Sequence, residues 1–255
     1  MGRPTREFKA DHSYHITTRC NNREFNLARR EIRETFLHII KKAQDKYSFK
    51  LYGLCIMLNH VHYLIEPEKP DDLPKIMHWL NWYSAMTFNA LLNRKGHFWE
   101  QRYSCHGFPN HDRQRGLNTL RYIHANPKAA GMKQSFFYDF SNYGSYHQLS
   151  NDGLSQWHPA FLALAPNFDD CAQRYKGFCT RYTPRKKKTK INPWGKKRLA
   201  GLLVNRHRSK QKPVTTGQMS LPFYQPELVQ ISLSPIAEQA LTFIQANRCN
   251  YQPLE

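Results

Sequence analysis

Several common features are scarce or absent in this chain, and each absence excludes a class of protein or site. No apolar run reaches the roughly 18 residues of a transmembrane helix, and the first residues lack the apolar stretch of a secretory signal. The six cysteines form no CxxC pair, which argues against a disulfide framework or a cysteine zinc site and fits a reducing cytoplasm. No GxxxxGK[ST] segment occurs, so the chain carries no P-loop for nucleotide hydrolysis. We therefore expect a cytoplasmic protein with no membrane partner.

Acidic residues are also scarce. Asp and Glu total 19 against 38 Lys and Arg, which gives a formal net charge of +19. A surplus of this size favours a polyanionic partner, and aromatic residues, at 13%, could stack on bases. A solvated basic surface and an anionic membrane are the alternatives. Nucleic acid is the partner that the composition favours.

The hydrophobic periodicity predicts alternating strands and helices. Strand patterns cover residues 13–19, 49–58, 61–67 and 96–108, the last as a strand or hairpin, and helical patterns cover 27–46, 73–94 and 113–126. The helix 27–46 has its apolar positions at Ile32, Phe36, Ile39 and Ile40, and Pro127 is expected to end the third helix. This order predicts an α+β fold of ferredoxin/RRM-like type, a split β-α-β-β-α-β antiparallel sheet with helices on one face. The other face would be free for a ligand.

The pattern changes after about residue 150. We expect a domain over 1–150 and a short helical extension over 151–182. A basic linker or arm would follow over 183–215, and then a C-terminal segment, 216–255, with one probable helix.

The stretch "MLNHVHYLIEP" places His60 and His62 in a strand. Residues i and i+2 of a strand point to the same face, roughly 7 Å apart, so two imidazoles could converge on one metal ion. For an isolated pair, two packed histidines are the more common outcome. On the third helix, Tyr122 and Asn126 are separated by one turn and share a face. Tyr122 could be a packing residue and Asn126 a helix cap.

Three motifs occur together: "NHVH", "GHFWEQRYSC" and "LRYIHANPKAAGM". In this order they resemble the single-tyrosine HUH transposases of the IS200-like family, in particular the REP-associated tyrosine transposase branch. The resemblance covers roughly residues 10–150. It implies that His60, His62 and Asn126 bind Mg²⁺ or Mn²⁺ and that Tyr122 is the catalytic nucleophile. It also implies single-stranded DNA with hairpin repeats as the partner, and cleavage and rejoining through a 5′-phosphotyrosine intermediate.

Other residues are candidate DNA contacts. Trp99 could stack on a base and Arg102 could bind a phosphate, although Trp99 could equally lie in the core. Lys128 is a possible neighbour of Tyr122. Arg185, Lys186 and Lys187 begin a basic arm that could bind a hairpin stem through its phosphates.

Three rival functions remain open. The chain could be a non-catalytic DNA or RNA hairpin-binding protein derived from such a transposase. It could be an HUH replication initiator or relaxase, although such proteins are usually larger. It could also be a histidine-based zinc hydrolase in which water is the nucleophile. The oligomeric state is open between monomer and dimer.

Overall fold

The computed structural model describes residues 6–184. Its regular elements, in chain order, are β1 (His12–Arg19), η1 (Asn21–Arg23), α1 (Arg30–Lys46), β2 (Phe49–Ile56), β3 (His60–Pro67), η2 (Pro70–Asp72), α2 (Leu73–Leu91), β4 (Ser104–Pro109), α3 (Arg113–Ala129), α4 (Tyr143–His147), α5 (Pro159–Leu162) and α6 (Phe168–Thr180). The predicted basic arm and C-terminal helix, with Arg185, Lys186 and Lys187, lie outside the described residues. Within 6–184, no helix is long and apolar enough to cross a bilayer.

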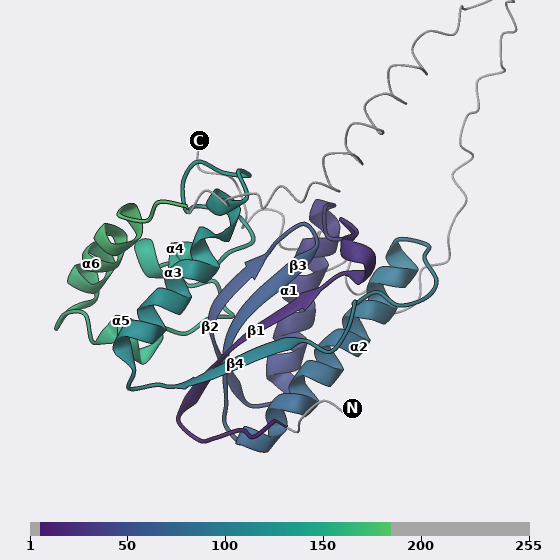
Figure 1. The fold of residues 1–255 in the computed structure, drawn as a ribbon, viewed down its shortest axis with the longest axis horizontal. Helices are drawn as coiled ribbons and strands as arrows, with labels where there is room; N and C mark the ends of the chain where they lie inside the picture. The colour runs from purple at the N-terminus through teal and green to yellow at the C-terminus, as the bar shows by residue number, and fades with distance from the viewer. Residues whose placement is uncertain (1–5, 185–255) are drawn as a thin grey trace, which may run out of the picture. The chain divides into compact units, whose positions relative to one another are not determined.

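The four strands form one antiparallel sheet in the order β2-β3-β1-β4 (Figure 1). The two strands that are neighbours along the chain, β2 and β3, pair directly, whereas β1 lies between β3 and β4. This is the strand order of a split β-α-β-β-α-β sheet, and the predicted fold class is confirmed.

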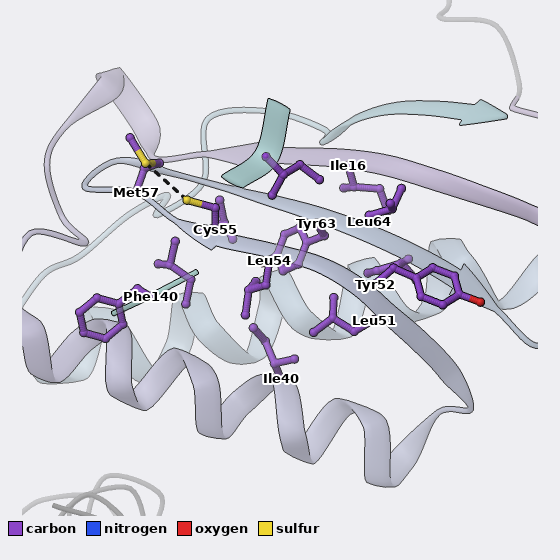
Figure 2. Close-up of a cluster of buried hydrophobic side chains, with 14 of the residues drawn as sticks. Ile16, Ile40, Leu51, Tyr52, Leu54, Cys55, Met57, Tyr63, Leu64 and Phe140 are labelled. Atoms are coloured by element: carbon purple, nitrogen blue, oxygen red, sulfur yellow. Dashed lines mark hydrogen bonds between the residues drawn. The ribbon is translucent and has the colours of Figure 1, made fainter. Parts of the chain in front are cut away.

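One face of the sheet packs on α1 and α2. The apolar stripe of α1 is buried as predicted, at Ile32, Phe36, Ile39 and Ile40. The Phe36 ring lies 6.4 Å from Tyr63 of β3 and 5.3 Å from Phe88 of α2, centroid to centroid. Figure 2 shows Ile40 beneath Leu54 and Tyr63, side chains from paired positions of β2 and β3.

The opposite face is not free over its whole width, contrary to our expectation. Helix α3 packs on β2 and β3 there. Gly53 permits this contact: a Cβ at this position would lie 3.1 Å from Ile123 Cδ1. The apolar residues of α3, Leu120 and Ile123, have no exposure, and burial of such side chains stabilises the packing. The β1–β4 half of this face is open at Ser104 and His106, whereas Ser13 and Phe108 are buried against His158.

Helix α3 does not end at Pro127 but continues to Ala129. Proline has no backbone N–H to donate to the carbonyl four residues earlier, here that of Ile123, and its ring clashes with this carbonyl. The Asn126 Nδ2 atom lies 3.4 Å from that carbonyl oxygen and donates to the Tyr122 carbonyl at 2.7 Å. The side-chain amide therefore compensates for the missing backbone donor, and the helix tolerates the proline.

The segment before β4 is largely irregular. We predicted a strand or hairpin over 96–108, and the structure has a strand only from Ser104. Trp99 forms an isolated bridge with Cys20, and its indole N–H donates to the Asn81 carbonyl and to Ser84 Oγ, at 3.1 and 3.0 Å. Phe98 and Trp99 of this motif therefore contribute to the core, whereas His97 is exposed.

The predicted helical extension packs on the domain. Helix α5 contacts α3, and α6 contacts α4 and α5. His124 of α3 connects these elements: its Nε2 lies 2.9 Å from Asn142 Oδ1 and its Nδ1 lies 2.8 Å from the Tyr175 hydroxyl. Asn142 Oδ1 accepts hydrogen bonds, which places the imidazole proton on Nε2, so Nδ1 is the acceptor for Tyr175. Burial lowers the pKa of His124 to about 4.

This buried histidine predicts a loss of stability in acid. Between pH 6.5 and about 4 the unfolded chain binds a proton at His124 and the folded chain does not. The free energy of unfolding should therefore fall as the pH falls through this window, by up to about 1.4 kcal/mol per pH unit for this group. Urea titrations at several pH values measure the slope.

His124→Gln should flatten that slope, even if it lowers stability at neutral pH. The exposed His111→Ala is the matched control and should keep the wild-type slope. Equal slopes in the wild type and His124→Gln would contradict the assignment.

Candidate active site

His60 and His62 lie on the outer face of the sheet, as the strand pattern predicts. Their ring centroids are 5.0 Å apart and the ring planes are nearly perpendicular. His62 is buried, at 4% exposure, whereas His60 is half-buried. Across the β1–β3 pairing, Arg19 lies opposite His60 and Thr17 lies opposite His62.

Hydrogen bonds set the orientation of the His60 ring. His60 Nδ1 lies 2.7 Å from Asn59 Oδ1, and the Asn59 amide is oriented by its own Nδ2, which donates to the Arg23 carbonyl. Because an amide oxygen only accepts, His60 Nδ1 carries the proton and Nε2 keeps its lone pair. This is the arrangement typical of metal-binding histidines, whose second nitrogen donates to an oxygen acceptor.

The sequence analysis missed His15, which contacts His62 from β1. His62 Nδ1 lies 3.1 Å from His15 Nε2 and 3.0 Å from Thr17 Oγ1, and the two imidazoles are stacked at 5.3 Å. Both contacts engage Nδ1, so the Nε2 atom of His62 makes none of the hydrogen bonds found here. The alternation of "SYHITTR" put His15 and Thr17 on one face of a strand, and the predicted topology pairs this strand with β3, but the sequence did not indicate the register that sets Thr17 opposite His62.

All three imidazoles favour the neutral form. Burial, and then the charge of His106, lower the pKa of His15 to about 4. Burial and the positive charge of Arg19 lower the pKa of His60 to about 4, and burial holds that of His62 well below its usual value. Neutral imidazole is the form that binds a metal ion, so the protonation state of these rings near neutral pH is compatible with the predicted metal binding.

Tyr122 lies against this cluster from α3. Its ring centroid is 5.5 Å from both His15 and His62, and both ring pairs are edge-to-face. The side chain is 50% exposed, so the phenol is accessible to a substrate. The structure therefore places Tyr122 against His62, one of the two predicted metal ligands, and against His15.

Asn126, one turn after Tyr122, is half-buried. Its Nδ2 donates to the Tyr122 carbonyl, so the amide is held and Oδ1 is its remaining polar atom. Within residues 6–184, no group of three or more histidine, cysteine, aspartate or glutamate side chains is placed to hold a metal ion. A metal at this site would therefore need a ligand of another kind beside His60 and His62, and the Asn126 Oδ1 atom is a suitable one. The donor set fits a divalent cation.

Arg19 is a second residue that the sequence analysis missed. It is exposed, lies opposite His60, and contributes positive charge at both His60 and His62. An anionic phosphate bound at the histidine pair would be attracted by this charge.

The three candidate DNA contacts within the described residues differ in their exposure and surroundings. Arg102 is exposed and remains a candidate for a phosphate contact. Trp99 is a core residue at 9% exposure, which supports the packing alternative over base stacking. Lys128 Nζ lies 5.4 Å from the centre of the Phe136 ring, six residues along α3 from Tyr122 and on another side of the helix.

The comparisons with known proteins agree with this fold. Residues 8–126, a little under half of the chain, match the family model described as "Transposase IS200 like". Among solved structures, the chain is similar to a REP-associated tyrosine transposase bound to a REP hairpin. The identity is 19%, the TM-score is 0.50, and the match covers 61% of this chain and 89% of that one.

A second structure, a candidate transposase from Deinococcus radiodurans R1, matches at 18% identity over 48% of this chain and 96% of that one. Its TM-score of 0.32 is too low to indicate a shared fold. No curated protein matches the chain. The motifs, the strand order and the family match agree: residues 8–126 of this chain are similar to the IS200-like transposases.

Proposed function

We propose that this protein is a metal-dependent single-stranded DNA endonuclease and strand transferase that acts next to hairpin repeats. The observation that carries the proposal is the position of Tyr122, a half-exposed phenol 5.5 Å from the His62 ring on the face that also presents His60. A tyrosine that served only for packing would bury its ring, whereas this one is open to a substrate.

His60 Nε2, His62 Nε2 and Asn126 Oδ1 are the atoms that would hold the cation. Bound there, Mg²⁺ or Mn²⁺ supplies Lewis-acid stabilisation of charge on the phosphate oxygens. Two imidazole ligands favour Mn²⁺ over Mg²⁺, because Mg²⁺ prefers oxygen. Thr17 and His15 hold the His62 ring in position through Nδ1, and Asn59 does the same for His60.

The reaction follows from the nucleophile. The Tyr122 oxygen attacks the phosphorus and loses its proton, and the bond from phosphorus to the 3′ oxygen breaks. The departing oxygen takes a proton and becomes a free 3′-OH, while the phosphate remains on Tyr122 as a 5′-phosphotyrosine. Because the phosphodiester is retained as a covalent link, a second 3′-OH can reverse the step and join strands without ATP.

The substrate class follows from charge and family. The net charge of +19 favours a polyanion, and the solved relative is bound to a REP hairpin. We propose a DNA hairpin with a single-stranded flank as the substrate here too. Arg102 and Arg19 would bind phosphates, as would Lys128 and the residues Arg185, Lys186 and Lys187; binding of this kind is independent of sequence.

The first prediction from the proposed function tests the nucleophile. Purified protein, labelled hairpins from the DNA that flanks its gene, and Mn²⁺ should give a slow-migrating, protease-sensitive adduct on a denaturing gel. Tyr122→Phe and His60→Ala should abolish the adduct, because one removes the nucleophile and the other a ligand. Tyr47→Phe and the exposed His78→Ala are matched controls and should form it normally.

Two results would contradict this reading. Cleavage that survives in Tyr122→Phe would identify water as the nucleophile and favour a metal-dependent hydrolase. Tight hairpin binding with no adduct in either metal would favour the non-catalytic binding protein.

A second prediction concerns Asn126. Asn126→Ala should raise the Mn²⁺ concentration needed for half-maximal adduct formation by about tenfold or more, whereas Asn126→Asp, which keeps an oxygen donor, should stay closer to the wild type. Thermal unfolding without metal separates this effect from the lost hydrogen bond to the Tyr122 carbonyl. An unchanged Mn²⁺ requirement in Asn126→Ala would remove Asn126 from the ligand set.

A third prediction concerns Arg19. If its charge stabilises the scissile phosphate, Arg19→Ala should slow adduct formation by about tenfold or more on ordinary DNA, as loss of a charge-assisted contact does. On a substrate with a neutral methylphosphonate at the cleavage position, wild type and Arg19→Ala should react at similar rates. The exposed Arg29→Ala should match wild type on both substrates. An equal defect of Arg19→Ala on both substrates would contradict the charge argument.

A further inference from the structure

A groove of about 620 Å³ opens beside Tyr122, on the part of the sheet that α3 leaves uncovered. Its floor includes Ser104 and His106 of β4, and its wall is the flank of α3 that carries Gln114, Asn118 and Tyr122. The groove therefore begins at Tyr122, the candidate nucleophile, and extends toward β4, an edge strand of the sheet.

The groove forms because α3 is amphipathic. Leu120 and Ile123 are buried over β2 and β3, and this contact turns the polar flank of the helix toward β1 and β4. On the floor, Ser104 and His106 are exposed, and Ser104 Oγ lies 3.2 Å from His106 Nε2. A polar strand opposite a polar helix flank gives no apolar surface to bury, so the two do not close on each other.

The lining suits a nucleobase. Gln114 and Asn118 present side-chain amides, the groups that read base edges, while the rings of His106, His15 and Tyr122 offer flat surfaces for stacking. Asn118 Oδ1 accepts from Arg121 at 3.2 Å, which orients the amide and leaves Nδ2 as a donor. The volume is within the usual range for a site that holds one small ligand.

We propose that this groove holds the base of one nucleotide next to the scissile phosphate, and that Gln114 and Asn118 bind the edge of that base. The proposal rests on the proposed function, because the phosphate at Tyr122 fixes which nucleotide reaches the groove. Part of the preference for a particular DNA sequence would then come from contacts between these two side chains and the base.

Binding measurements test the groove without requiring cleavage. The protein is Tyr122→Phe, which keeps the ring that lines the groove, and the probes are hairpins with single-stranded flanks from the DNA beside the gene. Each probe carries one abasic position near the cleavage site. One position should weaken binding by about tenfold, the loss expected for one base contact.

The same abasic scan is repeated after Gln114→Ala and Asn118→Ala are added together. Both side chains are exposed, so the fold should not change. The penalty at that one position should disappear, while penalties elsewhere remain. Gln173→Ala, an exposed glutamine on α6, is the matched control and should keep the full penalty.

The outcomes separate this proposal from the proposed function. The loss of affinity at each abasic position could be the same with and without the two substitutions. That result would contradict the proposed base contact, even if wild-type protein forms the Tyr122 adduct. Failure of Tyr122→Phe to bind any of these DNAs would overturn it as well. A penalty that depends on Gln114 and Asn118, with no adduct in the wild type, would support the groove and contradict the proposed catalysis.

Discussion

The contact between α3 and β2 at Gly53 determines most of what the candidate site can do. A Cβ at this position would lie 3.1 Å from both Ile123 Cδ1 and Leu64 Cβ, so a larger residue would require these side chains to give way by a few tenths of an ångström. Tyr122 precedes Ile123, and the close approach of the helix holds its ring against His15 and His62. If Tyr122 is the nucleophile that we propose, a shift of about 1 Å in this packing would alter its position relative to the phosphate, to which reaction rates are sensitive.

The sequence predicted those parts of the fold and site that depend on local periodicity. The strand alternation placed His60 and His62 on one face, and the helical repeat placed Tyr122 and Asn126 one turn apart. Residues brought in by pairing between distant segments were not predictable in this way. His15 and Arg19 reach the site only because β1 pairs with β3, with Arg19 opposite His60. Trp99 was ambiguous for a related reason, since an aromatic residue in a basic motif gives no sign of whether a distant helix covers it.

The continuation of α3 past Pro127 shows how a local rule fails for a local reason. Proline usually ends a helix because a donor is lost, but Asn126 provides a substitute donor from its side chain. The same hydrogen bond orients the amide whose oxygen we assign to the cation. The two interpretations of this residue from the sequence, a helix cap and a metal ligand, are therefore compatible, because the nitrogen of one amide can serve the first role while its oxygen serves the second.

Electrostatics explains why the site combines neutral imidazoles with a nearby arginine. A cation that bound to charged histidines would be repelled, and burial keeps His15, His60 and His62 neutral near pH 7. Arg19 adds positive charge at the exposed rim, where it disfavours the free cation but favours the anionic phosphate. Binding of cation and DNA should consequently support each other, since the phosphate offsets the repulsion between Arg19 and the cation. Such mutual dependence is reciprocal by linkage, so DNA would tighten cation binding by the same factor that the cation tightens DNA binding.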